Sequence, residues 1–278
     1  TRTRRRRKDQ RKVTASELIG IHLSDLHLTA DPRERPAGQP PLDRARAVLN
    51  FIRTRALTPD FCVISGDLSH DGQPDSYRQV ARFLVEVRQT GVPVIAGLGN
   101  HDQRVAFRQV VLGEPGTSED TPYVTRQVIA GLQIIMLDSR VPGAVAGSLS
   151  PGQLDWLDQV LDLPMPRGHL LVFHHPPFAP PVPHLPDHQL TNTDQLAAVI
   201  QGRALVGMLH GHIHIGSSGQ FHGTVCATAP GVAYTYDPLN HAMLDMQPGA
   251  GFNLVHIREG TMLCTPISLP HTDLLSNS

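Results

Sequence analysis

The sequence predicts an α/β protein in which two β-sheets pack against each other and helices cover their outer faces. Apolar runs of strand length alternate with segments of helical periodicity through the first two thirds of the chain, and strand-like runs then cluster toward the C-terminus. Of the 278 residues, 40% are hydrophobic, which is enough for a sizeable core. We therefore expect one large domain over residues 17–268, with short tails at 1–16 and 269–278.

Five short apolar runs are predicted as strands, and each is followed at once by a polar cluster that contains Asp, Asn or His. Parallel strands of this kind end at a common edge of their sheet, where open α/β folds bind ligands. The runs are 18–23, 61–64, 92–98, 170–173 and 204–209.

Four segments are predicted as helices. The segment 42–57 has an apolar stripe, and 74–91 opens on a proline, which favours the first helical position. A third helix begins at Ser150, because Ser150 and Gln153 fit the capping-box pattern. A fourth, at 194–201, stops before a glycine.

The remaining elements are strands. A hairpin is expected over 123–138, turning at Ala130-Gly131, and no clear element is expected at 234–250. The proline-rich loop 30–41 is long enough to reach over the edge where the polar clusters meet. The later strands are 219–221, 224–228, 252–257 and 261–267.

The polar clusters contain the ligand types of a nitrogen/oxygen metal site. Carboxylate, imidazole and amide without thiolate suit Mn, Fe or Zn, and the many imidazoles argue against Ca or Mg. Seven candidates are too many for one tetrahedral ion but suit two ions that share a carboxylate, an arrangement that favours hydrolysis at phosphorus. The candidates are Asp25, His27, Asp67, Asn100, His174, His212 and His214.

The ordered set D-x-H, G-D, G-N-H-D, H-H-P-P and G-H-x-H resembles the calcineurin-like metallophosphoesterase superfamily, in particular its bacterial class III cyclic nucleotide phosphodiesterases and related glycerophosphodiesterases. Segments 21–27, 136–143 and 253–256 extend the resemblance, which covers about residues 17–268. It implies a four-layer αββα sandwich of two mixed sheets flanked by helices. It also implies a homodimer, with loops 176–192 and 234–250 forming a cap beside the substrate pocket.

The resemblance also assigns roles. The first metal is expected on Asp25, His27 and His214, the second on Asn100, His174 and His212, and Asp67 is expected to bridge them. A hydroxide shared by the metals is the expected nucleophile, since metal binding lowers the pKa of water.

Two further residues are expected to act in catalysis. By resemblance, His101 faces the substrate phosphate, where it stabilises the transition state or protonates the leaving alkoxide. Asp102 is expected to orient the His101 ring. Tyr234 and Tyr236 are candidates to lie near the site.

Other histidines have alternative interpretations. His22 is expected to be packed or bonded within its strand, and His175 to shape its loop. His210 either supports a ligating imidazole or only fills space. His70 stands where relatives carry Asp or Asn, so it either alters phosphate contacts and the pH profile or is a solvated loop residue. Surface or loop positions are expected for His184, His188, His222, His241 and His271.

The predicted reaction is hydrolysis of small phosphodiesters, foremost 3′,5′-cyclic AMP to 5′-AMP. Glycerophosphodiesters, or a promiscuous range that includes monoesters, are the alternative substrates. A nucleic-acid-binding protein that uses the basic N-terminus is a distant alternative, and a redox di-metal protein is a weaker one still.

Charge and cysteine content complete the prediction. Eight of the first twelve residues are Arg or Lys, which leaves 16 basic and 24 acidic residues in the remainder. The tail at 1–16 is expected to be disordered, as a solubilising extension, a start codon placed too early, or an arm for nucleic acid or anionic lipid. No export signal and no apolar run of the roughly 18 residues that a membrane span needs are found, and Cys62, Cys226 and Cys264 suggest no disulfide framework. A cytoplasmic location is expected.

Overall fold

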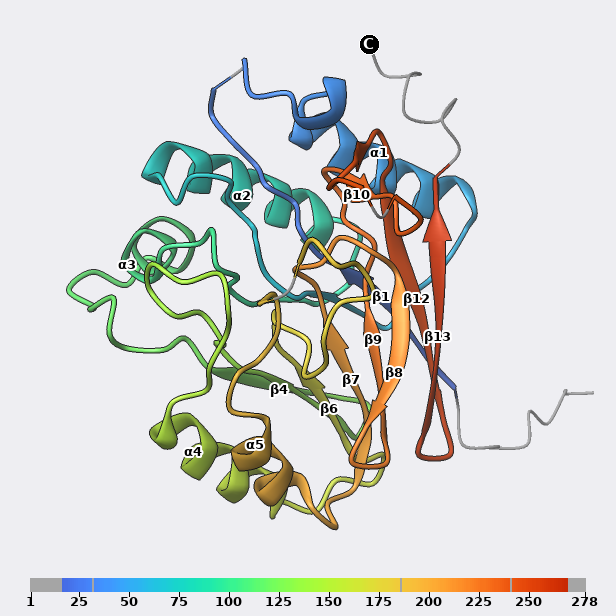
Figure 1. The fold of residues 1–278 in the computed structure, drawn as a ribbon. Coiled ribbons are helices and arrows are strands. Elements are labelled where there is room, and N and C mark those ends of the chain that lie inside the picture. Colours follow the sequence, from blue (N-terminus) through green and yellow to red (C-terminus); the bar gives the residue numbers. More distant parts are fainter. Residues whose placement is uncertain (1–16, 32, 186, 241, 270–278) are drawn as a thin grey trace, which may run out of the picture.

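The structure, a computed structural model, describes residues 17–31, 33–185, 187–240 and 242–269. Two β-sheets pack against each other, with two helices outside each, as expected (Figure 1). The tail at 1–16 and most of the one at 269–278 lie outside the described residues, as do His241 and His271. None of the helices in the described part of the chain has the length and apolarity that a membrane crossing needs.

The first sheet has five strands in the order β13-β12-β1-β2-β3. β1, β2 and β3 run parallel, and β12 pairs antiparallel with β1. α1 and α2 cover its outer face through a core that joins Val48 and Phe83 to Ile21 and Cys62. The strands are β1 Leu18–Leu23, β2 Phe61–Ile64, β3 Val94–Ala96, β12 Gly251–Arg258 and β13 Thr261–Ser268; the helices are α1 Pro41–Thr54 and α2 Pro74–Arg88.

The second sheet has six strands in the order β4-β5-β6-β7-β9-β8. β5, β6, β7 and β9 run parallel, so their carboxyl ends share one edge. α4 and α5 cover this sheet, and a separate apolar layer fills the space between the two sheets. The strands are β4 Thr125–Ile129, β5 Leu132–Met136, β6 His169–Val172, β7 Leu205–His210, β8 Ser217–Phe221 and β9 Thr224–Thr228; the helices are α4 Pro151–Leu161 and α5 Thr193–Ile200.

Most predicted elements are confirmed within a few residues, including the turn at Ala130-Gly131, where both residues have positive φ. Only one of the two hydrogen bonds of the predicted capping box at Ser150 is present. Ser150 Oγ accepts from the Gln153 main-chain N–H, but the Gln153 amide turns away to bond the main chain of Asp138 at both of its atoms. This glutamine therefore ties α4 to the end of β5 instead of closing the cap.

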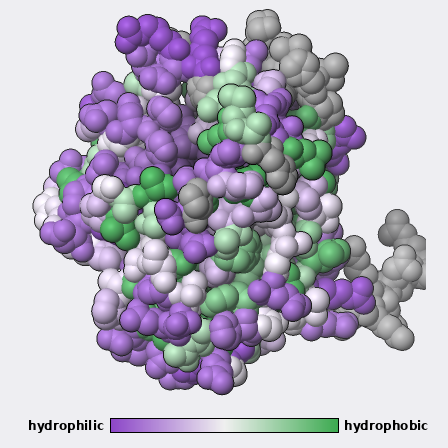
Figure 2. All heavy atoms as spheres, in the orientation of Figure 1, coloured by the Kyte–Doolittle hydropathy of each residue, from purple (hydrophilic) through white to green (hydrophobic). Residues whose placement is uncertain are grey.

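Three features were not predicted. A short helix, α3 Arg104–Phe107, continues into a π-helical turn at Arg108–Leu112, and a small antiparallel pair, β10 Thr235–Tyr236 with β11 Met246–Gln247, lies where no element was expected. A 3-10 turn at Pro36–Gly38 interrupts the proline-rich loop. The segment between β10 and β11 leaves apolar side chains exposed, and Figure 2 shows apolar atoms in this region among hydrophilic ones. These side chains are Leu239, Met243, Leu244 and Met246.

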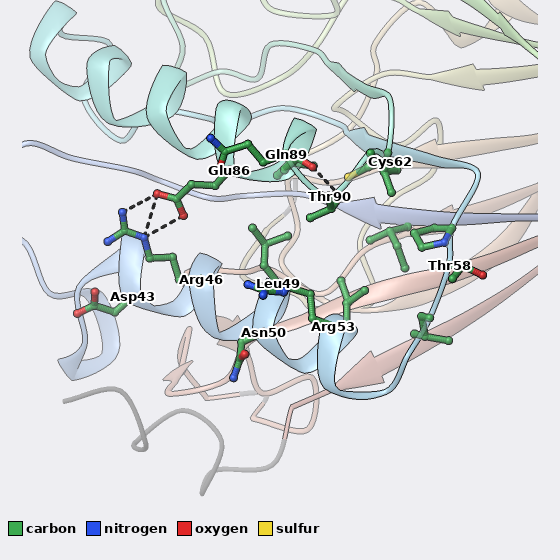
Figure 3. Close-up of a pocket in the computed structure, with 17 residues that line it drawn as sticks. Asp43, Arg46, Leu49, Asn50, Arg53, Thr58, Cys62, Glu86, Gln89 and Thr90 are labelled. Carbon is green, nitrogen blue, oxygen red and sulfur yellow. Dashed lines mark hydrogen bonds and ion pairs between the residues drawn. The ribbon is translucent and has the colours of Figure 1, made fainter.

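A cavity of about 1050 Å³ lies between α1 and α2 (Figure 3). Its floor includes Leu49 and Cys62, and an ion pair between Arg46 and Glu86, 2.6 Å from Nη2 to Oε1, links the two helices beside it. None of the predicted site residues lines this cavity. The predicted chemistry belongs to a much smaller cavity at the carboxyl ends of the strands.

Candidate metal centre

The five polar clusters converge, as expected from their positions after strands. The Asp25 N–H donates to the Gly66 carbonyl (3.0 Å) and the His27 N–H to the Asp67 carbonyl (2.9 Å), so the loops after β1 and β2 run side by side. The Asp25 carboxylate also accepts the main-chain N–H of His212 (3.1 Å), from the second sheet. The site therefore lies where the two sheets meet.

One group of side chains consists of Asp25, His27, Asp67 and His214, all buried, with one potential ligand atom from each within 4.8 Å of the others. His27 Nε2 lies 3.2 Å from His214 Nε2 and 3.6 Å from Asp67 Oδ2. His214 Nε2 lies 3.4 Å from Asp25 Oδ1. These are the residues predicted for the first metal, together with the predicted bridge.

A second group consists of Asp67, His174 and His212, also buried. His174 Nε2 lies 3.4 Å from Asp67 Oδ2 and 3.2 Å from Asn100 Oδ1. Asp67 is the carboxylate common to both groups. All seven candidates thus lie close together, and their assignment to two metal ions stays a prediction.

Five of the seven candidates have a left-handed backbone: Asp25, His27, Asp67, His212 and His214 have φ between 43° and 71°. Such conformations are unfavourable for residues with a side chain, by about 1–2 kcal/mol each, and strain of this kind concentrates at functional sites. In D-x-H and H-x-H the middle residues, Leu26 and Ile213, are fully buried in apolar clusters. The chain therefore packs each middle residue into the core while both flanking polar residues join the site.

The glycines of the motifs leave room for the ligands. A Cβ at Gly99 would collide with the Asp67 carboxylate and lie 2.7 Å from His174 Nε2, and one at Gly66 would lie 2.6 Å from His174 Nδ1. Gly66 also has φ +128°, which other residues rarely adopt. The glycine in G-N-H-D is therefore set by space, and the one in G-D by space and backbone conformation.

The ring orientations are fixed from outside the cluster. His174 Nδ1 lies 3.2 Å from the Ser65 carbonyl, and His214 Nδ1 lies 2.9 Å from the Tyr234 carbonyl. The Tyr234 ring also stacks on His214, with centroids 4.1 Å apart. Ligating histidines are commonly held at their second nitrogen in this way. The expected proximity of Tyr234 and Tyr236 to the site is confirmed.

The electrostatics of the cluster favour a bound cation. Burial would raise the pKa of Asp67, but the neighbouring His174 and His27 lower it well below its usual value. Burial opposes protonation of His174, yet Asp67 and Asp25 raise its pKa to about 9. The Asp67 carboxylate therefore stays ionised and requires positive charge beside it, while burial holds the pKa of His27 and His212 low and leaves these imidazoles neutral. A buried ionised carboxylate beside the neutral imidazoles of His27 and His212 fits the Mn, Fe or Zn chemistry that the ligand types predict.

His101 lies at the edge of this cluster, half-buried, and its ring meets the His27 ring edge to face with centroids 4.7 Å apart. Its Nδ1 bonds to the main-chain carbonyl of His70 (2.8 Å), and its main-chain N–H donates to Asp67 Oδ1 (3.0 Å). The ring is therefore held by a carbonyl oxygen. This corrects the expectation that Asp102 orients it.

Asp102 instead joins two loops. Its buried carboxylate accepts the main-chain N–H groups of Leu68, Ser69 and Gly99 at 2.9–3.0 Å and the Tyr77 hydroxyl at 2.9 Å. The carboxylate is fully buried, and these four hydrogen bonds satisfy it from within the fold. Asp102 therefore fixes the loops that carry Asp67 and Asn100.

The remaining histidines divide between core and site. His22 is buried, bonded to Ser65 Oγ and to the Asn253 amide, as expected. His175 bonds Ser139 Oγ (2.7 Å) and packs behind His212, which agrees with a loop-shaping role. The hydrogen bond of His210 goes to the Phe173 carbonyl and its ring packs on the Phe173 ring, which favours the space-filling alternative. His184 and His222 are exposed.

Two further histidines lie beside the site. His188, expected on the surface or in a loop, is a loop residue whose ring stacks on His212 with centroids 4.9 Å apart. His70 is only half-exposed and contacts both His27 and His101. The sequence held no local signal for His188, because its loop is brought to the site by the packing of distant segments.

A cavity of about 140 Å³ opens beside the cluster and reaches the predicted ligands. Both loops that were expected to border it do so, through Leu185 and His188 from one and Tyr236 and Leu244 from the other. Val145 adds an apolar contact that the sequence did not indicate. The lining of the cavity thus combines charged and polar side chains with apolar and aromatic ones.

Comparison with known proteins shows the family to which the chain belongs. The family model for calcineurin-like phosphoesterases matches residues 21–216. A probable cyclic nucleotide phosphodiesterase of Rhodococcus erythropolis is 34% identical, over 90% of this chain and 83% of its own length. A cAMP/cGMP dual specificity phosphodiesterase of Mycobacterium tuberculosis is 32% identical, over 91% and 80%.

Solved structures show the same fold at low sequence identity. The GAP50 anchor of the inner membrane complex of Plasmodium aligns with a TM-score of 0.61 and 13% identity, over 91% of this chain and 84% of its own. Purple acid phosphatase from yellow lupin aligns with a TM-score of 0.58 and 12% identity, over 95% and 56%. From the family model and the 34% identical relative, the chain belongs to the calcineurin-like phosphoesterase family and is a phosphoesterase.

Proposed function

We propose that this protein hydrolyses small phosphodiesters, foremost 3′,5′-cyclic nucleotides, with two metal ions held by the seven clustered residues. The observation that carries the proposal is the Asp67 carboxylate, which belongs to two of the three groups of potential ligands among the described residues; the third, His27, His70 and His101, has no carboxylate. The names of the relatives from Rhodococcus erythropolis and Mycobacterium tuberculosis support the substrate class.

In this proposal Asp25, His27 and His214 hold the first ion and Asn100, His174 and His212 the second, with Asp67 between them. Mn, Fe and Zn all suit this ligand set. Two such ions, when bound, polarise the phosphate and lower the pKa of the attacking water. Cyclic AMP would gain one P–O bond from water, lose its 3′ P–O bond and leave as 5′-AMP.

The role of His101 follows from its hydrogen bond. Because Nδ1 lies against a carbonyl oxygen, that nitrogen carries a proton. A neutral ring therefore presents an unprotonated Nε2, and a protonated ring presents an Nε2–H donor. We assign that donor to the leaving oxygen, whose departing charge it would neutralise.

The lining of the cavity supports a phosphoester substrate with an organic substituent. The cavity of about 140 Å³ is lined by Asp67 and Asn100, which are proposed metal ligands, and by the apolar side chains Val145, Leu185 and Leu244. The cysteines in the described residues, Cys62, Cys226 and Cys264, are free thiols, and we propose the reducing cytoplasm as the compartment of the reaction.

A side-by-side turnover assay on Mn²⁺-reconstituted protein tests the proposal. The substrates are 3′,5′-cyclic AMP, 2′,3′-cyclic AMP, glycerophosphoethanolamine and 4-nitrophenyl phosphate, with products separated by chromatography. Preference for 3′,5′-cyclic AMP with 5′-AMP as product supports it. Preference for the glycerol diester changes the substrate class, and cleavage of the monoester alone refutes diesterase activity.

A further inference from the structure

His70 is held beside His27 by the main chain. The segments after β1 and β2 continue the parallel pairing of their strands: the Leu28 N–H donates to the Leu68 carbonyl (2.9 Å) and the His70 N–H to the Leu28 carbonyl (3.0 Å). The position of His70 next to a predicted metal ligand is therefore built into the backbone.

The His70 side chain connects that ligand to the loop between β1 and α1. Its Nδ1 lies 3.4 Å from His27 Nδ1, and its Nε2 lies 3.7 Å from Glu34 Oε2. The rings of His70 and His101 also stack, with centroids 5.5 Å apart. His70 is thus the middle member of a chain from Glu34 to His27.

The proton positions along this chain follow from the geometry. His27 directs Nε2 at His214 and Asp67, so a metal-ligating His27 carries its proton on Nδ1. The His70 Nδ1 then acts as the acceptor, and the His70 proton lies on Nε2, on the side of Glu34. The second nitrogens of His174 and His214 lie against main-chain carbonyls instead.

We propose that His70 is a positioning residue for the first metal ion, and that Glu34 supports it. The Glu34–His70–His27 chain would fix the His27 ring and increase the basicity of its Nε2, as outer hydrogen bonds to ligating histidines do. This inference rests on the proposed metal centre. The Glu34 carboxylate is about half exposed (46%), so its contribution is the smaller one.

Zinc release from the fully loaded protein tests this assignment, with a chromophoric chelator as the acceptor. His70→Phe keeps a ring of similar size but removes the acceptor, and His70→Asn restores an acceptor. Glu34→Gln removes the charge. The matched control is Glu17→Gln, which removes the carboxylate 2.9 Å from the half-buried His256, at the opposite end of β1.

We expect one of the two zinc ions to leave His70→Phe about 10–100-fold faster than wild type. Release from His70→Asn should be intermediate, release from Glu34→Gln a few-fold faster than wild type, and release from the control unchanged. His101 keeps its bond to the His70 carbonyl in every variant, so loss of that contact does not explain a difference. In the His70→Phe background, Glu34→Gln should have no further effect.

Three results would overturn the inference. The first is zinc release from His70→Phe at the wild-type rate. The second is a Glu34→Gln effect on that rate that is as large in the His70→Phe background as in wild type. The third is a third zinc ion in wild type that His70→Phe lacks, because His70 would then be a ligand of another ion. Wild-type protein that binds no metal refutes the proposed function and this inference together. If wild type binds two ions and turns over while the variants match it, only this inference fails.

Discussion

Asp67 is the residue on which the proposed pair of metal ions depends most. Asp67→Asn keeps the size of the side chain but removes the charge that both groups of ligands share. We expect metal analysis to find fewer than two ions per chain and kcat/KM to fall by more than about 100-fold, since even outer partners of ligands cost 10–100-fold. Two retained ions with normal turnover would contradict the shared-carboxylate arrangement.

His101 separates catalysis from metal binding. His101→Ala removes the Nε2 donor assigned to the leaving oxygen but none of the seven proposed ligands. Turnover should therefore fall by about 10²–10⁴-fold, while metal analysis still finds two ions per chain. Loss of an ion would show that His101 is a ligand and that its assigned role is wrong.

At the scale of single residues, the sequence predicted which side chains gather at the site better than it predicted the contacts that they make. The seven ligand candidates were identified because each follows a predicted strand. The actual partners of Asp102 and His70 were not, since those contacts join loops whose relative positions depend on the packing of both sheets.

At the scale of elements, Asp102 joins the loops after β2 and β3. In wild type the Asp102 carboxylate accepts hydrogen bonds from four donors. In Asp102→Asn the amide N–H₂ group faces some of these donors instead, and each buried donor left without an acceptor costs about 1–3 kcal/mol. We expect urea denaturation to show a loss of about 2–4 kcal/mol in the free energy of unfolding. Unchanged stability with abolished turnover would return Asp102 to a direct catalytic role.

The bounds of some helices and strands differ from those that the local sequence pattern predicts. The helix expected at 42–57 ends at Thr54, and the strand expected at 92–98 is the shorter β3, Val94–Ala96. Gly97 and Leu98 belong to the expected strand because of their apolar surroundings, but a Cβ at Gly97 would meet the Met136 side chain, and just beyond, one at Gly99 would meet Asp67 and His174. Contacts from distant segments, which the local pattern does not contain, determine these ends.

At the scale of the whole molecule, acid should destabilise the fold through His22. Burial, and secondarily His210, lowers the pKa of His22 to about 3, whereas an unfolded histidine titrates near 6.5. The unfolded chain therefore binds this proton first, so the stabilisation is complete above pH 6.5 and is lost as the pH falls toward 3. From pH 7.5 to 5.0 we expect His22 to contribute a loss of about 2 kcal/mol, at 1.36 kcal/mol per pKa unit.

Urea unfolding at both pH values, for wild type and His22→Gln, measures this contribution. The variant should lose less stability than wild type over the same interval, because glutamine does not titrate. An equal loss in both proteins would assign the acid sensitivity to other groups.

The predicted homodimer also belongs to this scale. The segment between β10 and β11 exposes Leu239 by 83% and Met243 by 62%, and we propose that a second copy covers these side chains. Light scattering after gel filtration should give a dimer at micromolar concentration for wild type and a monomer for Leu239→Asp combined with Met243→Asp. A monomeric wild type would refute the proposal.

The position of the site between the two sheets has a consequence for the order of folding. Asp25 and His212 touch across 187 positions of the chain, and contacts this distant in sequence form slowly because a long loop must close first. Neither half of the chain contains all seven proposed ligands, so the proposed centre is complete only after the sheets have docked. A metal ion that binds only this docked state raises the free energy of unfolding by mass action. The rate at which refolding protein takes up the metal would therefore report the rate at which the two sheets dock.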